Sequence, residues 1–120
     1  MIAGLWPKIF IIALVFLGEA LYIYGQMLGA KGDYLNSKPF WNVFLKAFLI
    51  IAIAGGTVLF GYMLGINVFK NIWVVSVISI TSILLMEPIL AWVFFKQIPT
   101  PGAIVGFILG AIGLFTATFF

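Results

Sequence analysis

The sequence predicts an all-α fold, a bundle of four transmembrane helices that forms a single membrane domain of 120 residues. Two observations lead to this prediction. The chain is 65% hydrophobic and 8% charged, whereas a soluble domain is about 45–50% apolar and about 25% charged. Four apolar runs also reach the roughly 20 residues that a helix needs to cross the hydrocarbon core. These runs cover approximately residues 9–30, 43–66, 72–95 and 102–120.

Polar or helix-breaking segments separate the four runs. Residues 31–39 are polar and end in a proline, residues 67–71 predict a tight turn, and residues 98–102 combine two prolines with a glycine. Four spans would place both chain ends on the same side of the membrane. We expect a multi-pass protein of a bacterial or archaeal inner (plasma) membrane.

The composition argues against several classes of function. The chain has no cysteine and no histidine, so disulfides and thiolate metal sites are excluded and the commonest general base is missing. Its six cationic residues are lysines spread singly along the chain, which disfavours a nucleic-acid-binding face. The serine and threonine hydroxyls have no histidine to activate them, so we expect no enzyme, no metal and no other cofactor.

Glu19 lies near the middle of the first apolar run. A charged side chain at that depth costs about 2.5–3.5 kcal/mol, so an intramembrane acid is a functional-site hypothesis by default. At helical spacing, Tyr22 and Gln26 follow Glu19 along one stripe. Because aromatic faces near a buried anion bind organic cations, we add Tyr62 and Trp73 to the wall of a predicted proton and cation site. The alternative is a structural hydrogen bond of Glu19 between helices, with the aromatic residues serving packing or lipid contact.

Glu87 is a second acid within an apolar run, the third one. Ser76 lies on the same helical stripe as Glu87, and Ser79 lies close to that stripe. These three residues form a secondary candidate site. A structural ion pair of Glu87 with Lys46 or Lys96 is the alternative, because lysines near span ends can reach along a helix with their long side chains.

The last apolar run has a regular glycine pattern. Gly102, Gly106 and Gly110 recur every four residues, and Gly113 follows. Such small-xxx-small stripes let two helices approach closely. Because a bundle of four such helices is too small to enclose a transport path, we predict a homodimer that packs along these glycines.

Several of these motifs resemble a known family. A single membrane-centre glutamate in the first of four short helices, here Glu19, is typical of the small multidrug resistance family. Residues 90–97 (LAWVFFKQ) look like that family's end of helix three, and Gly106 and Gly113 match its seven-residue glycine spacing. Residues 83–91, which contain a Glu-Pro pair, resemble a segment of the wider drug/metabolite transporter superfamily. The chain departs from the multidrug family where that family has a tryptophan in the middle of helix three.

The resemblance implies an antiparallel homodimer in which two copies of Glu19 face a shared chamber. In that family, protons and a cationic substrate compete for the glutamate pair. The leading functional hypothesis is therefore a proton-coupled exporter, an antiporter, of small organic cations.

Two alternatives remain open at the level of the sequence. Gly25-Gln26 followed by Lys31-Gly32 is similar to a pattern in small lipid-linked-sugar flippase subunits of the superfamily. The chain could thus be a flippase, or a flippase subunit, for a polyprenyl-phosphate-linked sugar, with a lipid phosphate as the recognised group. The third hypothesis is a non-transporting membrane scaffold in which Glu19 joins helices.

Overall fold

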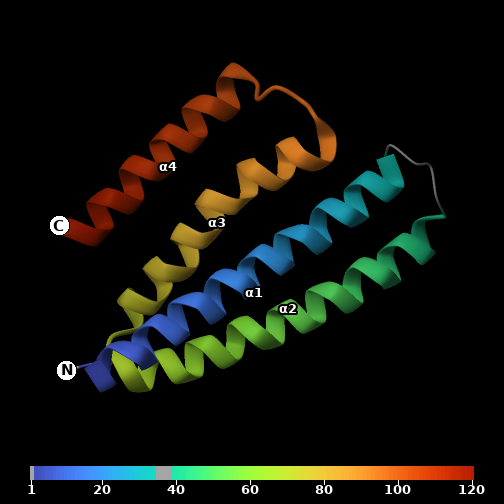
Figure 1. Ribbon diagram of the computed structural model, residues 1–120. Coiled ribbons are helices and arrows are strands. Elements are labelled where there is room, and N and C mark those ends of the chain that lie inside the picture. The colour runs from blue at the N-terminus through green and yellow to red at the C-terminus, as the bar shows by residue number, and fades with distance from the viewer. Residues whose placement is uncertain (1, 35–38) are drawn as a thin grey trace.

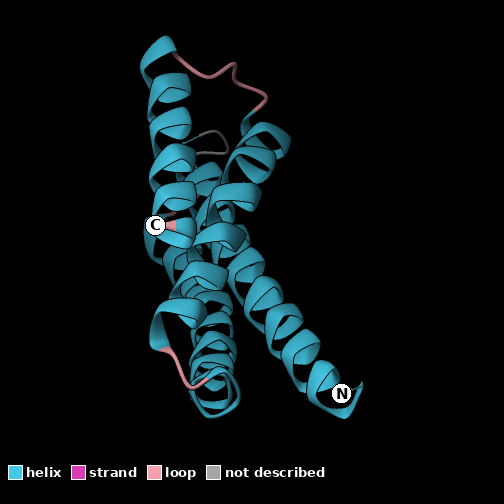
Figure 2. Ribbon diagram, turned by 90° about the vertical axis from the view of Figure 1, so that its left-hand side faces the viewer, coloured by secondary structure: helices cyan, strands magenta, loops and turns pink. Residues whose placement is uncertain are grey.

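The computed structural model describes residues 2–34 and 39–120, which form four helices joined by short connections. The helices are α1 (Ile2–Tyr34), α2 (Phe40–Phe69), α3 (Ile72–Phe95) and α4 (Pro101–Phe119). The described residues contain no strand, as Figure 2 also shows. The prediction of an all-α, four-helix fold is therefore confirmed.

Helix α1 is the central element of the bundle. It packs against α2 and α3, whereas α2 and α3 contact each other over a short length and α4 contacts α3 alone. The end of α1, the start of α2 and the α3–α4 connection lie at one end of the molecule, and α1 begins and α4 ends at the other end, near the α2–α3 turn (Figure 1). The principal extents of 52 × 33 × 20 Å describe a flattened bundle.

The close contact of α1 with α2 depends on glycines that face a neighbouring side chain. A Cβ added at Gly61 would lie 2.7 Å from Val15 Cγ2, and one added at Gly18 would lie 2.7 Å from Val58 Cγ2. Real Cβ atoms do not approach other atoms so closely, so a larger residue at either position would push the helices apart. The largest fully buried side chains are Ile11, Val15 and Ile23 of α1 and Val75 of α3.

The first helix is longer than the predicted span, and this corrects the predicted loop at residues 31–39. Helix α1 continues through Tyr34, and residues 35–38 of that loop lie outside the described residues. An apolar run predicts which part of a helix lies in the hydrocarbon core. The helix itself can continue into the polar residues that follow, because its backbone hydrogen bonds can still form there. Lys31 in the last turn favours this continuation because it interacts well with the negative end of the helix dipole. Gly32 also packs on α2, since a Cβ there would lie 3.0 Å from Val43 Cγ1.

The α2–α3 turn is shorter than the predicted segment 67–71, because α2 extends to Phe69. Lys70 has a φ of 61°, the left-handed conformation that ends many helices, and its N–H donates to the Ile66 carbonyl oxygen at 3.1 Å. The next residue, Asn71, caps α3 with its side-chain oxygen, which accepts a 2.9 Å hydrogen bond from the Trp73 N–H. Two residues therefore suffice to reverse the chain.

The α3–α4 connection, residues 96–100, overlaps the predicted break at residues 98–102, whose last two residues instead begin α4. Lys96 ends α3 in a left-handed conformation with a φ of 56°. The Thr100 hydroxyl oxygen caps α4 by accepting a 3.1 Å hydrogen bond from the Ala103 N–H, and Pro101 occupies the first helical position. Proline suits that position because its missing N–H would have no partner in the helix.

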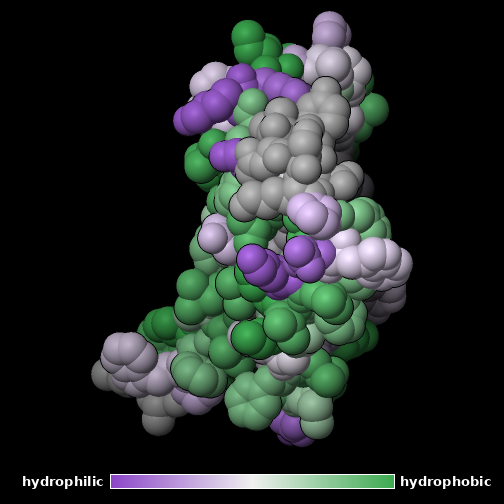
Figure 3. All heavy atoms as spheres, turned by 90° about the vertical axis from the view of Figure 1, so that its right-hand side faces the viewer, coloured by the Kyte–Doolittle hydropathy of each residue, from purple (hydrophilic) through white to green (hydrophobic). Residues whose placement is uncertain are grey.

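Three helices are long and apolar enough to cross a membrane, over Gly4–Gly32, Phe40–Phe69 and Ile72–Phe95. The apolar helix Pro101–Ala117 is shorter, and at 1.5 Å per residue all of α4 would span about 28 Å. In Figure 3, hydrophobic side chains cover most of the lower half of the face shown, and hydrophilic ones gather mainly in its upper half. These are the features of an integral membrane protein.

Candidate functional site

Glu19 is held in the contact between α1 and α3. Its side chain is 7% exposed and lies one turn from Val15 and Ile23, which are fully buried. Its Oε1 atom accepts a 2.6 Å hydrogen bond from the Ser79 Oγ of α3. Ser79 is itself 5% exposed. An intramembrane carboxyl is thus paired with a neutral hydroxyl rather than with a lysine.

A groove of about 450 Å³ opens beside this hydrogen bond, between α1, α2 and α3. We call it the acidic groove, because both intramembrane acids line it. Its lining residues include no lysine, and they are Glu19, Tyr22, Ile23, Gln26, Gly55, Val58, Ile83 and Glu87.

The acidic groove brings together four of the eight predicted site residues. Tyr22 and Gln26 line it with Glu19, as their shared helical stripe suggested, and Glu87 lines it from α3. Ser79, which the sequence associated with Glu87, contacts Glu19 instead. Ser76 is half-buried on α3 and does not line the groove.

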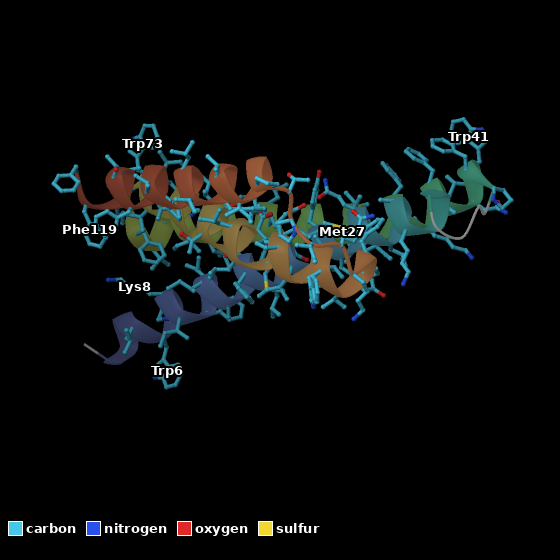
Figure 4. The ribbon with its side chains drawn as sticks, turned by 90° about the horizontal axis from the view of Figure 1, so that it is seen from above. Trp6, Lys8, Met27, Trp41, Trp73 and Phe119 are labelled. Atoms are coloured by element: carbon cyan, nitrogen blue, oxygen red, sulfur yellow. The ribbon has the colours of Figure 1, made fainter. Side chains whose placement is uncertain are left out.

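The two more distant aromatic candidates lie apart from the acidic groove within one chain. Tyr62 is half-buried on α2 and is absent from the lining. Trp73, in the first turn of α3, is 76% exposed. Figure 4 shows Trp73 pointing outward at the end of the molecule that also holds Phe119, with Trp41 at the opposite end. Their positions fit the interfacial aromatic residues common in membrane proteins.

Glu87 is half-buried, and within the described residues no ion pair joins it to Lys46 or Lys96. Glu87 instead lines the same groove as Glu19. Ligand binding by Glu87 stays a prediction.

The glycines of α4 face largely away from the rest of the chain. A Cβ at Gly102, Gly106 or Gly113 would have no atom within 4 Å, and one at Gly110 would lie 3.7 Å from Leu84 Cδ1 of α3. This open face is available to another helix. Dimerisation along it stays a prediction.

The sequence did not indicate the apolar walls of the groove, which Gly55, Val58 and Ile83 form. The adjacent glycines at positions 55 and 56 were the one available signal, because small residues in a span allow a hollow beside the backbone. The described residues bring together no group of three or more Asp and Glu side chains of the kind that holds a metal ion.

The chemistry of the acidic groove follows from its two carboxyl groups. A carboxyl can bind a proton or a cation, and apolar surroundings strengthen the attraction between a carboxylate and a cation because water screens it weakly. The half-buried Tyr22 ring adds an aromatic surface suited to an organic cation.

Comparisons of this chain with protein-family models, with curated proteins and with solved structures find no match. The resemblance to the small multidrug resistance family therefore stays a prediction from the sequence.

Proposed function

We propose that this protein is a proton-coupled exporter of small organic cations that works as a dimer in the inner (plasma) membrane of a bacterium or archaeon. The observation that supports it best is that buried Glu19 lines a groove of about 450 Å³ that also holds Glu87. The family resemblance supports the location and the dimeric state.

The groove beside Glu19 is the main argument for a transport role. The hydrogen bond from Ser79 alone is also what an acid that only joins helices would make. Glu19 has one hydroxyl partner on Oε1 and lines a groove large enough for a small ligand. A proton and a cation would compete for this carboxyl, so that binding of one releases the other, as exchange requires.

The dimer in this proposal accounts for the open side of the molecule. Helix α4 contacts α3 alone, and three of its four stripe glycines have free space beside them. A second copy packed on α4 would supply further walls for a path through the membrane.

Proton release from the detergent-purified protein tests the proposal. Adding a panel of quaternary ammonium cations in weak buffer should release about one proton for each cation bound. Glu19→Gln keeps the shape of the side chain but cannot ionise, so it should abolish release, whereas Glu19→Asp should retain it. Glu87→Gln is the matched control in the same groove and should leave at least part of the release intact.

Other outcomes would redirect the assignment. Release that persists in Glu19→Gln and disappears in Glu87→Gln would move the exchange site to Glu87. Release driven by lipid-phosphate headgroups instead of cations would favour the flippase. No release with either class of ligand would favour the scaffold.

A further inference from the structure

A second groove lies at the end of the bundle where α1 ends and α2 begins. Its volume is about 470 Å³, and we call it the basic groove. It shares no lining residue with the acidic groove. Among the described residues its lining includes no acid, and these lining residues are Leu28, Lys31, Gly32, Pro39, Asn42, Val43 and Lys46.

The polar groups of the basic groove are all able to donate hydrogen bonds to an anion. Lys31 comes from α1, and Lys46 and Asn42 come from α2, so the two helices approach the groove from different sides. Lys31 is half-buried, and its Nζ lies 5.6 Å from the centroid of the Phe94 ring of α3. Lys31 thus lines the groove and also makes a cation–π contact with α3. Two ammonium groups and an amide match the charge and the acceptor oxygens of a phosphate.

The surroundings of the basic groove place it at the level of lipid headgroups. The start of α2 carries exposed aromatic rings in contact with one another. Trp41 is 68% exposed, and its ring centroid lies 5.3 Å from that of Phe40 and 5.7 Å from that of Phe44. Exposed tryptophan is typical of the membrane–water interface. Lys46 lies six residues after Phe40, which is about 9 Å along the helix. Basic pockets between helices at this depth are suited to anionic headgroups.

We propose that the basic groove binds the phosphate of an anionic phospholipid headgroup. Leu28 and Val43 provide apolar walls for the adjoining part of the lipid, which a free phosphate does not need. The bound lipid would join the end of α1 to the start of α2, and through Lys31 it would also act on α3. This inference is independent of the cation-exporter proposal, because the two grooves share no residue and its test involves no transport.

Native mass spectrometry of the full chain in mixed micelles tests the site, with phosphatidylglycerol as the probe and phosphatidylcholine as the zwitterionic control. The wild type should bind phosphatidylglycerol preferentially. A lysine near an anionic lipid contributes about a fivefold gain in affinity. The double variant Lys31→Gln/Lys46→Gln should therefore bind phosphatidylglycerol about 25-fold more weakly.

Lys8→Gln/Lys70→Gln is the matched control, since it removes the same charge at the opposite end of the bundle, where Lys8 likewise lies 6.0 Å from an aromatic ring. This control should change the affinity for phosphatidylglycerol by less than about twofold. An equal loss of affinity in the two double variants would overturn the proposal, because it would show that net charge alone attracts the lipid. Lys31→Arg/Lys46→Arg, which conserves the charge, should retain the lipid, and its failure to do so while folded would also overturn the site. Displacement of phosphatidylglycerol by inorganic phosphate at equal concentration would refute the lipid as the ligand.

Discussion

The hydrogen bond between Ser79 and Glu19 makes a quantitative prediction about stability. Ser79→Ala removes the only donor that reaches Glu19 Oε1 in the described part of the chain and leaves the rest of the α1–α3 contact in place. Hydrogen bonds between membrane helices contribute about 0.6 kcal/mol on average and about 1.7 kcal/mol at most. An orphaned buried polar group costs about 1–3 kcal/mol.

The geometry places this pair near the upper end of the membrane values. The oxygen–oxygen distance is 2.6 Å, and the two side chains are 7% and 5% exposed. We therefore expect Ser79→Ala to lower the free energy of unfolding by about 1.5 kcal/mol, a little more than tenfold in the unfolding equilibrium.

Ser82→Ala provides a matched control on the same helix. Ser82 is 3% exposed, but its hydroxyl donates to the Ile78 carbonyl oxygen of its own helix at 2.8 Å. Its loss should cost less than about 0.5 kcal/mol, because no contact between helices is broken and the Ile78 carbonyl keeps its helical partner. Reversible unfolding in mixed micelles with increasing dodecyl sulfate, followed by circular dichroism, measures the free energy of unfolding of both variants. Equal destabilisation by the two substitutions would refute the role of the Glu19–Ser79 bond.

Two further predictions concern the glycines. Gly61→Ala should destabilise the fold by about 1–3 kcal/mol in the same unfolding assay, because its Cβ would lie 2.7 Å from Val15 Cγ2. Gly56→Ala, whose Cβ would meet no atom within 4 Å, should be neutral or stabilising by up to about 1 kcal/mol. A larger loss of stability from Gly56→Ala than from Gly61→Ala would contradict the packing of α1 on α2. Replacing Gly106 and Gly110 by Leu should separate the predicted dimer, as measured by cross-linking in membranes. Unchanged dimers would place the interface elsewhere.

Much of the fold could be predicted because hydropathy and helix breakers are local properties. The apolar run at residues 72–95 matches the bounds of α3, and the prolines and glycine at residues 98–102 mark the next connection. The end of α1 could not be placed in the same way. The polar residues after Ala30 are unfavourable in hydrocarbon but are compatible with a helix. Hydropathy therefore predicts where the apolar span ends, and α1 continues beyond that point to Tyr34.

The candidate site shows what one sequence cannot provide. The spacing of Glu19, Tyr22 and Gln26 on one helix predicted that they share a face, and all three line the acidic groove. The partner of Glu19 could not be predicted, because the register of α3 against α1 depends on packing between distant segments. Ser79 was for that reason assigned to the neighbourhood of Glu87, although its hydroxyl contacts Glu19.

The packing of α1, α2 and α3 bears on which helices would move when a ligand binds in the proposed exchange. Glycines and fully buried aliphatic side chains join α1 closely to α2, whereas a polar pair contributes to the contact of α1 with α3. A ligand shifts a conformational equilibrium only by its difference in affinity for the two states. The Glu19–Ser79 bond contributes about 1.5 kcal/mol, and a cation that replaces the Ser79 hydroxyl as the partner of Glu19 breaks it. To offset that loss, the cation must bind the state with the broken bond roughly tenfold more tightly than the state with the bond intact. On the proposed function, the α1–α3 contact is therefore where binding at Glu19 would most easily move one helix against another, while the α1–α2 pair moves as a unit.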